Sequence, residues 1–149
     1  MTWPFIDTHC HFDFPPFADH AADSLARAAQ AGVTQIIVPA IEAENFPRVL
    51  ALAEQHEAIY AAVGLHPIAI ERHDERSLER LEECLRQRHR KLVAVGETGL
   101  DLYRDDPQFE RQQVMLEAQL RLAKRYDLPV ILHSRRTHDT LAMLLKKHA

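Results

Sequence analysis

Short apolar segments alternate with longer amphipathic segments along the whole chain. The short segments read "PFIDTH", "TQIIVPA", "AIYAAVG", "KLVAVG" and "LPVILH", and they are rich in Val and Ile. Nearly continuous apolar runs of this length are typical of strands that are buried on both faces, as in parallel sheets. The pattern therefore predicts five buried strands.

The amphipathic segments between these strands predict helices. Asp19 and Asp106 are the expected N-caps of the first and fourth helices, and Pro107 suits the first turn of the fourth. Gly32 suits the end of the first helix. The expected helices cover about residues 19–30, 43–56, 74–88, 106–125 and 137–149.

Five strand–helix units in succession predict an α/β fold with parallel strands and right-handed crossovers. Two arrangements fit: an open doubly wound sheet, and part of a (β/α)8 barrel of the TIM type. A complete barrel usually takes about 250 residues, so a chain of 149 residues would hold roughly the first five of its units. No linker or low-complexity stretch interrupts the pattern, which predicts one partial-barrel domain over residues 1–149.

Composition limits the kinds of partner that we expect. The formal net charge of −4 provides no broad positive surface for nucleic acid or an anionic membrane. A polyanionic substrate would have to be held locally, by a few Arg side chains or by metal ions. The two cysteines, Cys10 and Cys84, form no disulfide framework or zinc motif, which favours the reducing cytosol. We find no signal-peptide pattern and no apolar run of the ~20 residues that span a membrane.

Candidate metal ligands stand where the predicted strands end, the place where parallel α/β folds gather functional residues. His9 and His11 follow the first strand, His66 the third, Glu97 the fourth and His133 the fifth. Residues two apart on a strand project to the same face, so His9 and His11 can bind one cation. Glu97 could bridge this cation and a second one held by His133. Two cations ~4 Å apart can activate water and stabilise displacement at phosphorus.

Each of these residues also has an ordinary structural interpretation. A lone His-x-His pair often occurs by chance, Glu97 could be a buried carboxylate paired with Arg, and His133 could cap a helix. Their joint placement at the ends of three strands favours the metal site. Nitrogen and oxygen ligands suit Zn, Mn, Co or Ni, and Mg less well. The remaining histidines are expected to be solvated: His20, His56, His73, His89, His138 and His148.

Three nearby residues have alternatives that the sequence leaves open, and a fourth, Cys10, has one interpretation. Asp7 could orient an imidazole or be a satisfied buried carboxylate. Arg135 could meet a phosphate or form a surface ion pair. Asp101, in the loop after Glu97, could act as a general base or brace that loop. Cys10 has the opposite parity to the histidines, which predicts a small core residue.

The segments "FIDTHCHFD", "VGLHP", "VAVGETGLDLY" and "LPVILHSR" resemble, in order and spacing, the TatD family of metal-dependent deoxyribonucleases. The resemblance covers essentially the whole chain and implies a (β/α)8 barrel with a metal centre at its C-terminal mouth. It also implies hydrolysis of phosphodiester bonds in DNA, with 3′–5′ exonuclease character and two divalent cations per complete site. The implied roles are first-metal ligands His9 and His11, bridging ligand Glu97, second-metal ligand His133, and phosphate-binding residues His66 and Arg135.

The chain also departs from that family pattern. Family members continue through three more strands, which carry another histidine and an aspartate for the metals, whereas this sequence ends at "LLKKHA" within a helix. Unpaired sheet edges predict that the chain associates with itself. Two rival functions remain: a related hydrolase acting on an amide or lactone, and an interaction protein without catalysis. Glu97 stands against the first rival, since such enzymes often use a modified lysine at the fourth strand.

Overall fold

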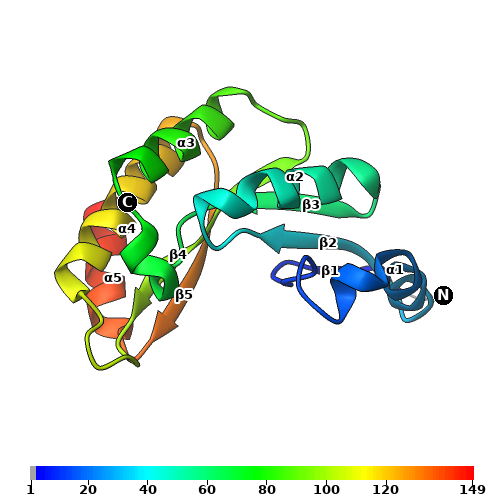
Figure 1. Cartoon of the computed structure of the whole chain (residues 1–149), viewed down its shortest axis with the longest axis horizontal. Helices are drawn as coiled ribbons and strands as arrows, with labels where there is room; N and C mark the ends of the chain where they lie inside the picture. The colour runs from blue at the N-terminus through cyan, green and yellow to red at the C-terminus, as the bar shows by residue number, and fades with distance from the viewer. Residues whose placement is uncertain (1–2) are drawn as a thin grey trace.

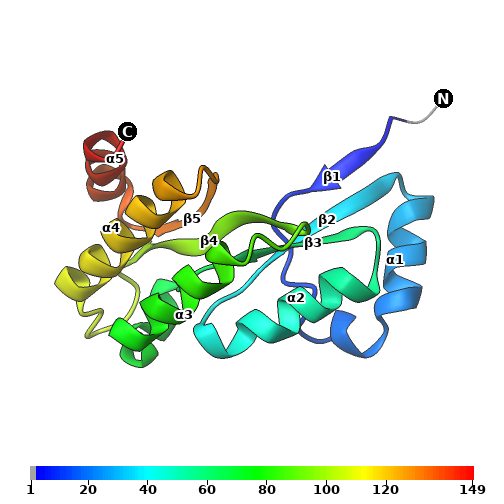
Figure 2. The ribbon, with the colours of Figure 1, turned by 90° about the horizontal axis from the view of Figure 1, so that it is seen from above.

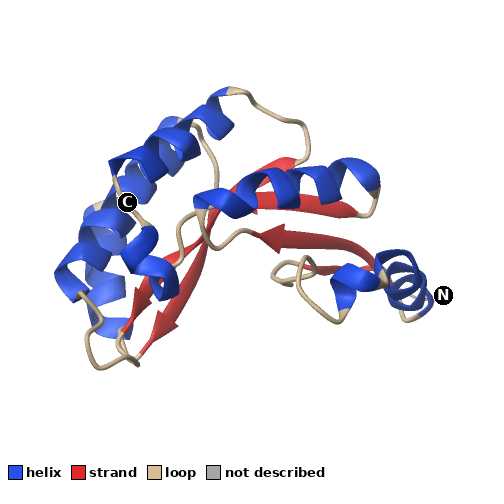
Figure 3. Ribbon diagram, in the orientation of Figure 1, coloured by secondary structure: helices blue, strands red, loops and turns tan. Residues whose placement is uncertain are grey.

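The computed structural model describes residues 3–149, which form one curved parallel sheet with helices between its strands (Figures 1 and 3). The strands are β1 (Phe5–Asp7), β2 (Val33–Pro39), β3 (Ile59–Val63), β4 (Leu92–Asp101) and β5 (Val130–Arg135). The helices are α1 (Ala21–Gln30), α2 (Phe46–Gln55), α3 (Glu75–Arg86), α4 (Phe109–Arg125) and α5 (His138–Lys147). Three short 3-10 helices, η1 (Phe17–Asp19), η2 (Ala43–Asn45) and η3 (Pro67–Arg72), lie between them.

The order of the strands decides between the two predicted arrangements. The sheet runs β1-β2-β3-β4-β5, and every neighbouring pair is parallel. A doubly wound sheet would reverse direction at a switch point, whereas a barrel adds each strand beside the previous one. Figure 2 shows the sheet bending along its length, with α2 and α3 on the same side. The chain is therefore a half-barrel of five strand–helix units.

The core lies between the middle strands and the helices that cover them. Ile59, Val63 and Val95 are completely buried and pack with Phe46 of α2 and Leu81 of α3. Burial of each such side chain stabilises the fold by about 1.5–3 kcal/mol. This layer of apolar side chains fixes the middle strands, so residues at their carboxyl ends are held firmly.

The prediction that all five strands are buried on both faces is wrong for β1. Phe5 and Ile6 are 62% and 54% exposed, because β1 is an outer strand with one neighbour, β2. The other outer strand, β5, is only partly buried. A continuous apolar run thus indicated a strand correctly but did not indicate its position in the sheet.

Two predicted helix starts are also wrong. Asp19 ends the 3-10 helix η1, and α1 begins at Ala21. Asp106 and Pro107 precede α4, which begins after Gln108 in the left-handed conformation (φ +50°). In both places a short non-α segment separates the aspartate from the helix, so neither Asp19 nor Asp106 is an N-cap. The predicted stop at Gly32 is confirmed by its φ of +95° just after α1. Among residues 3–149, no helix combines the length and apolar character needed to cross a bilayer.

Candidate metal centre

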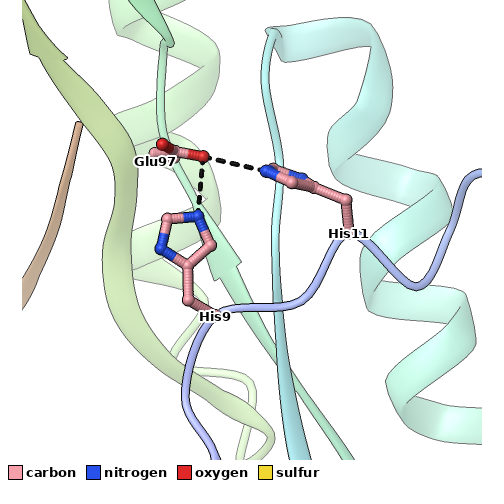
Figure 4. Close-up of side chains that lie close together, drawn as sticks. All are labelled: His9, His11 and Glu97. Atoms are coloured by element: carbon pink, nitrogen blue, oxygen red, sulfur yellow. Dashed lines mark hydrogen bonds and ion pairs between the residues drawn. The ribbon is translucent and has the colours of Figure 1, made fainter. Parts of the chain in front are cut away.

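Four imidazoles surround the carboxylate of Glu97, which is only 3% exposed within β4. On one side, the Nε2 atoms of His9 and His11 lie 2.9 and 3.0 Å from Glu97 Oε1, and both rings point at that oxygen (Figure 4). On the other side, His66 Nε2 and His133 Nδ1 each lie 3.3 Å from Oε2. The structure thus brings together all five residues that the strand ends suggested.

The donor atoms form two groups that share Glu97. One group contains His9, His11 and Glu97, and the other contains His66, Glu97 and His133; within each, the candidate ligand atoms lie within 4.8 Å of one another. Imidazole nitrogen with carboxylate oxygen is the donor set that Zn and its neighbours in the first transition row prefer. The residues present therefore fit one or two divalent cations.

His9 and His11 reach the cluster from a loop, not from a strand as the spacing argument assumed. β1 ends at Asp7, and both histidines follow it. The loop is held by the backbone N–H of Cys10, which donates to Ile37 O at 3.1 Å. Asp7 Oδ1 accepts from the backbone N–H of His9 at 3.2 Å, so Asp7 contacts the main chain and not the ring.

Cys10 is half-buried against the core, in agreement with the small core residue that its parity predicted. Burial raises the pKa of its thiol, and the nearby Asp7 and Asp13 carboxylates add to the shift. The loop is thus anchored on its inner side by packing, while His9 remains exposed.

Two buried glutamines of α4 hold the strand ends, and the sequence analysis did not identify them. Gln119 Oε1 accepts the N–H of Leu65 at 2.8 Å, and its Nε2 donates to Leu65 O at 3.3 Å. Gln112 does the same for Asp101, accepting its N–H at 2.8 Å and donating to its carbonyl at 2.9 Å. Each side chain thus satisfies the backbone N–H and C=O of one residue, as a neighbouring strand would. Glutamines seven residues apart on the apolar face of a helix were the available signal.

The tautomer of His66 follows from its contacts. His66 Nδ1 accepts the backbone N–H of Ile68 at 2.9 Å, so the lone pair of the neutral ring is used there. The proton of the neutral ring is then on Nε2, which faces Glu97. In this arrangement His66 donates a hydrogen bond into the cluster and does not offer a metal ligand. The second group then supplies Glu97 and His133 as ligands.

His73 contradicts the prediction of a solvated side chain. It is completely buried, and its Nε2 lies 2.7 Å from the backbone oxygen of His66. Burial lowers the pKa of His73, which keeps the ring neutral with Nε2–H as the donor. His73 therefore fixes the main chain from which His66 projects.

Asp101 is the last residue of β4, not a loop residue as predicted. Its Oδ2 lies 2.7 Å from His133 Nε2, and its Oδ1 accepts the backbone N–H of Tyr103 at 2.8 Å. A carboxylate on one imidazole nitrogen orients the other toward a metal. Gly99, with φ +145°, permits the close approach of β4 and β5, since a Cβ there would lie 1.9 Å from His133 O.

The electrostatics of the cluster keep Glu97 ionised. Burial alone would raise the pKa of Glu97, but hydrogen bonds from His11, His133 and His66 outweigh it and hold this pKa well below its usual range. In return, the hydrogen bond to Glu97 raises the pKa of His11 and that of His133. Burial would also raise the pKa of Asp101, but hydrogen bonds from Tyr103 N–H and His133 lower it. The centre therefore attracts positive charge.

Arg135 lies at the end of β5 with an exposed side chain. Its guanidinium carbon is 3.7 Å from the ring centroid of Tyr103. Among residues 3–149 it takes part in no ion pair, so the surface ion pair that the sequence left open is absent from the described part of the chain.

Comparison with known proteins places these observations in a family. The model of the TatD related DNase family matches residues 6–149. The metal-dependent hydrolase YjjV of Escherichia coli, described as uncharacterized, is 69% identical over 148 residues, covering 99% of this chain and 57% of that protein. Its crystal structure matches with a TM-score of 0.95 over 97% of this chain and 56% of that one.

Two more distant relatives extend the comparison. A 3′-5′ ssDNA/RNA exonuclease TatD from Pantoea sp. is 34% identical over 134 residues, covering 87% of this chain and 50% of that enzyme. A TatD family hydrolase from Entamoeba histolytica, 23% identical, shares the fold with a TM-score of 0.86, over 99% of this chain and 55% of that one. The chain thus spans about half the length of the relatives that it matches. Because the family model matches nearly the whole chain and YjjV is so similar, this chain belongs to the TatD-related DNase family.

Proposed function

We propose that this chain carries the metal centre of a hydrolase that cleaves phosphodiester bonds in DNA with 3′–5′ exonuclease character. The observation that supports this most directly is the convergence of four imidazoles on one buried carboxylate. Protons or salt bridges could satisfy one or two histidines there, but four around a single ionised carboxylate suit divalent cations. The family description and the exonuclease named among the relatives agree with the proposal.

The ligands divide between two cations. His9, His11 and Glu97 would hold the first, and Glu97 with His133 would hold the second, drawn from Zn, Mn, Co, Ni or Mg. When bound, such cations lower the pKa of water and offset negative charge on a phosphate. Metal dependence also agrees with the relatives named as metal-dependent hydrolases.

The remaining residues position the ligands and the substrate. Nε2–H of His66 points into the cluster and can donate to a phosphate oxygen. Arg135, at the same edge of the sheet, carries a guanidinium suited to bidentate phosphate contact. Asp101 was predicted as a general base or a brace. Its contacts to His133 and to the Tyr103 main chain support the brace, and a role as general base stays a prediction.

The test combines metal analysis with nuclease assays of the wild type and the His9→Ala/His11→Ala variant. We expect the variant to lose bound metal and cleavage of a single-stranded oligonucleotide together, in the intact barrel. The matched control is His20→Ala/His56→Ala, which removes two histidines outside the Glu97 cluster and should keep both the bound metal and the cleavage. Unchanged cleavage by the first variant would reject the assignment. Localisation to the cytosol and self-association through the outer strands stay predictions.

A further inference from the structure

One exposed aromatic side chain stands beside the candidate metal centre. Tyr103 is 59% exposed and lies two residues after the end of the strand that carries Glu97 and Asp101. Its backbone N–H donates to Asp101 Oδ1 at 2.8 Å, and the other oxygen of that carboxylate lies 2.7 Å from His133. The position of Tyr103 is therefore tied through one side chain to a candidate metal ligand.

The loop that carries Tyr103 is fastened on its other side as well. Leu102 N donates to Arg135 O at 3.1 Å, and Asp101 pairs with Arg135 in the register of β4 and β5. Arg104 donates to the backbone oxygen of Ile68 at 3.1 Å and forms an ion pair with Glu71. The exposed ring thus belongs to a braced loop, which lowers the entropy cost of using it for binding.

Arg135 covers one face of the Tyr103 ring, with its guanidinium carbon 3.7 Å from the ring centroid. Stacking uses the flat face of a guanidinium and leaves the N–H groups at its edge available for a phosphate. Since more than half of the Tyr103 side chain is exposed, the ring still offers surface to a planar ligand. The pair combines a stacking surface with an anion-binding fork, which is the chemistry of a nucleotide.

From this geometry we infer that Tyr103 is a substrate-positioning residue that stacks on an unpaired nucleobase next to the phosphate held by Arg135. This inference rests on the proposed function and deepens it. A stacked base requires an end or a single strand whose bases are free of the duplex. The ring would select for a nucleic acid over a phosphodiester that has no base, while tolerating any base.

The test compares binding of two probes by fluorescence anisotropy in EDTA, so that no cleavage occurs. One probe is a thymidine pentanucleotide, and the other is an abasic pentanucleotide with the same phosphates. Stacking on an aromatic side chain predicts about 5- to 150-fold tighter binding of the thymidine probe by the wild type. We expect Tyr103→Ala to abolish this preference and Tyr103→Phe to retain most of it.

Trp3→Ala is the matched control, because Trp3 is an exposed aromatic residue (76%) that precedes β1, at the opposite end of the sheet. This variant should keep the preference unchanged. A wild type that binds both probes equally, or neither, overturns the inference, as does a preference that survives in Tyr103→Ala. If the wild type shows the Tyr103-dependent preference but cleaves no phosphodiester with added metal, the inference is supported and the proposed function alone is rejected.

Discussion

The two sides of the candidate metal centre are built in different ways. Glu97 and His133 project from strands that α4 and neighbouring backbone hold in place, and His66 follows a strand fixed by Gln119. His9 and His11 project from a loop after the exposed strand β1. We call these the strand side and the loop side. The strand side sets the position of the carboxylate before any cation binds, whereas the loop side brings its imidazoles to that carboxylate.

This difference predicts how each side responds to change. On the strand side, polar contacts are buried, and removing one leaves backbone groups without partners. On the loop side, Asp7 contributes a single exposed hydrogen bond to His9 N at 3.2 Å. Glu97 belongs to both sides, since each of its oxygens faces two imidazoles.

The largest expected effect therefore comes from Glu97. Glu97→Gln removes the negative charge that both cation groups share and replaces one of the two oxygen ligands with an NH2 group. Metal binding should therefore weaken at both groups, and at the group that loses its oxygen by more than the ~100-fold seen for residues that only support ligands. His133→Ala serves as the comparison and should remove one cation while leaving the group of His9, His11 and Glu97 intact. Metal titration by calorimetry counts the sites. If the wild type and Glu97→Gln bind the same number of cations per chain, Glu97 does not bridge two cations.

A smaller effect is expected when a residue that holds the backbone near the ligands is replaced: Gln119 on the strand side or Asp7 on the loop side. The quantity that changes is the free energy of unfolding. Gln119→Leu leaves the N–H and carbonyl of Leu65 buried without partners, which should lower the free energy of unfolding by roughly 2–5 kcal/mol. Asp7→Ala, on the loop side, should lower it by less than about 1 kcal/mol because its hydrogen bond is exposed. Denaturant titrations of both variants measure the difference. If Asp7→Ala lowers the free energy of unfolding as much as Gln119→Leu does, the proposed difference between the strand side and the loop side is wrong.

The smallest expected effect concerns the attachment of α4, the helix that supports the strand side. Hydrogen bonds from Lys147 and His148 lower the pKa of Glu117 to about 2 and tie α5 to α4. A carboxyl whose pKa is lower in the folded state stabilises the fold above its ordinary pKa of about 4.3, and this contribution is lost as the pH falls toward 2.

Thermal unfolding of Glu117→Gln at several pH values checks this expectation. Its Tm should lie below that of the wild type at pH 7, and the gap should close between about pH 4 and pH 2. Glu57→Gln, in the loop after α2, is the control and should show a smaller gap, since Glu57 is exposed and lies outside any helix. A gap that grows on acidification has the wrong sign and contradicts the assignment.

Some features of the fold could be predicted from the sequence more reliably than others. Apolar runs identified all five strands, since short runs of this composition favour a strand wherever it lies in the sheet, and the exposed β1 is an example. Helix starts were less predictable: Asp74 caps α3 through a capping box with Ser77, yet Asp19 and Asp106 cap nothing. A capping residue type is common in turns as well as at helix starts, so its presence alone does not locate the first helical residue.

The sequence by itself determined that imidazoles and a carboxylate follow the strands of a parallel α/β fold, because strand periodicity and residue chemistry are local properties. Only the tertiary structure decided which atoms meet. The half-barrel places Glu97 between the histidines of the two sides, buries His73 beneath His66 and sets Tyr103 against Arg135. These contacts join residues from different strands and loops, and they depend on how the sheet curves and how α4 packs, which no local pattern specifies.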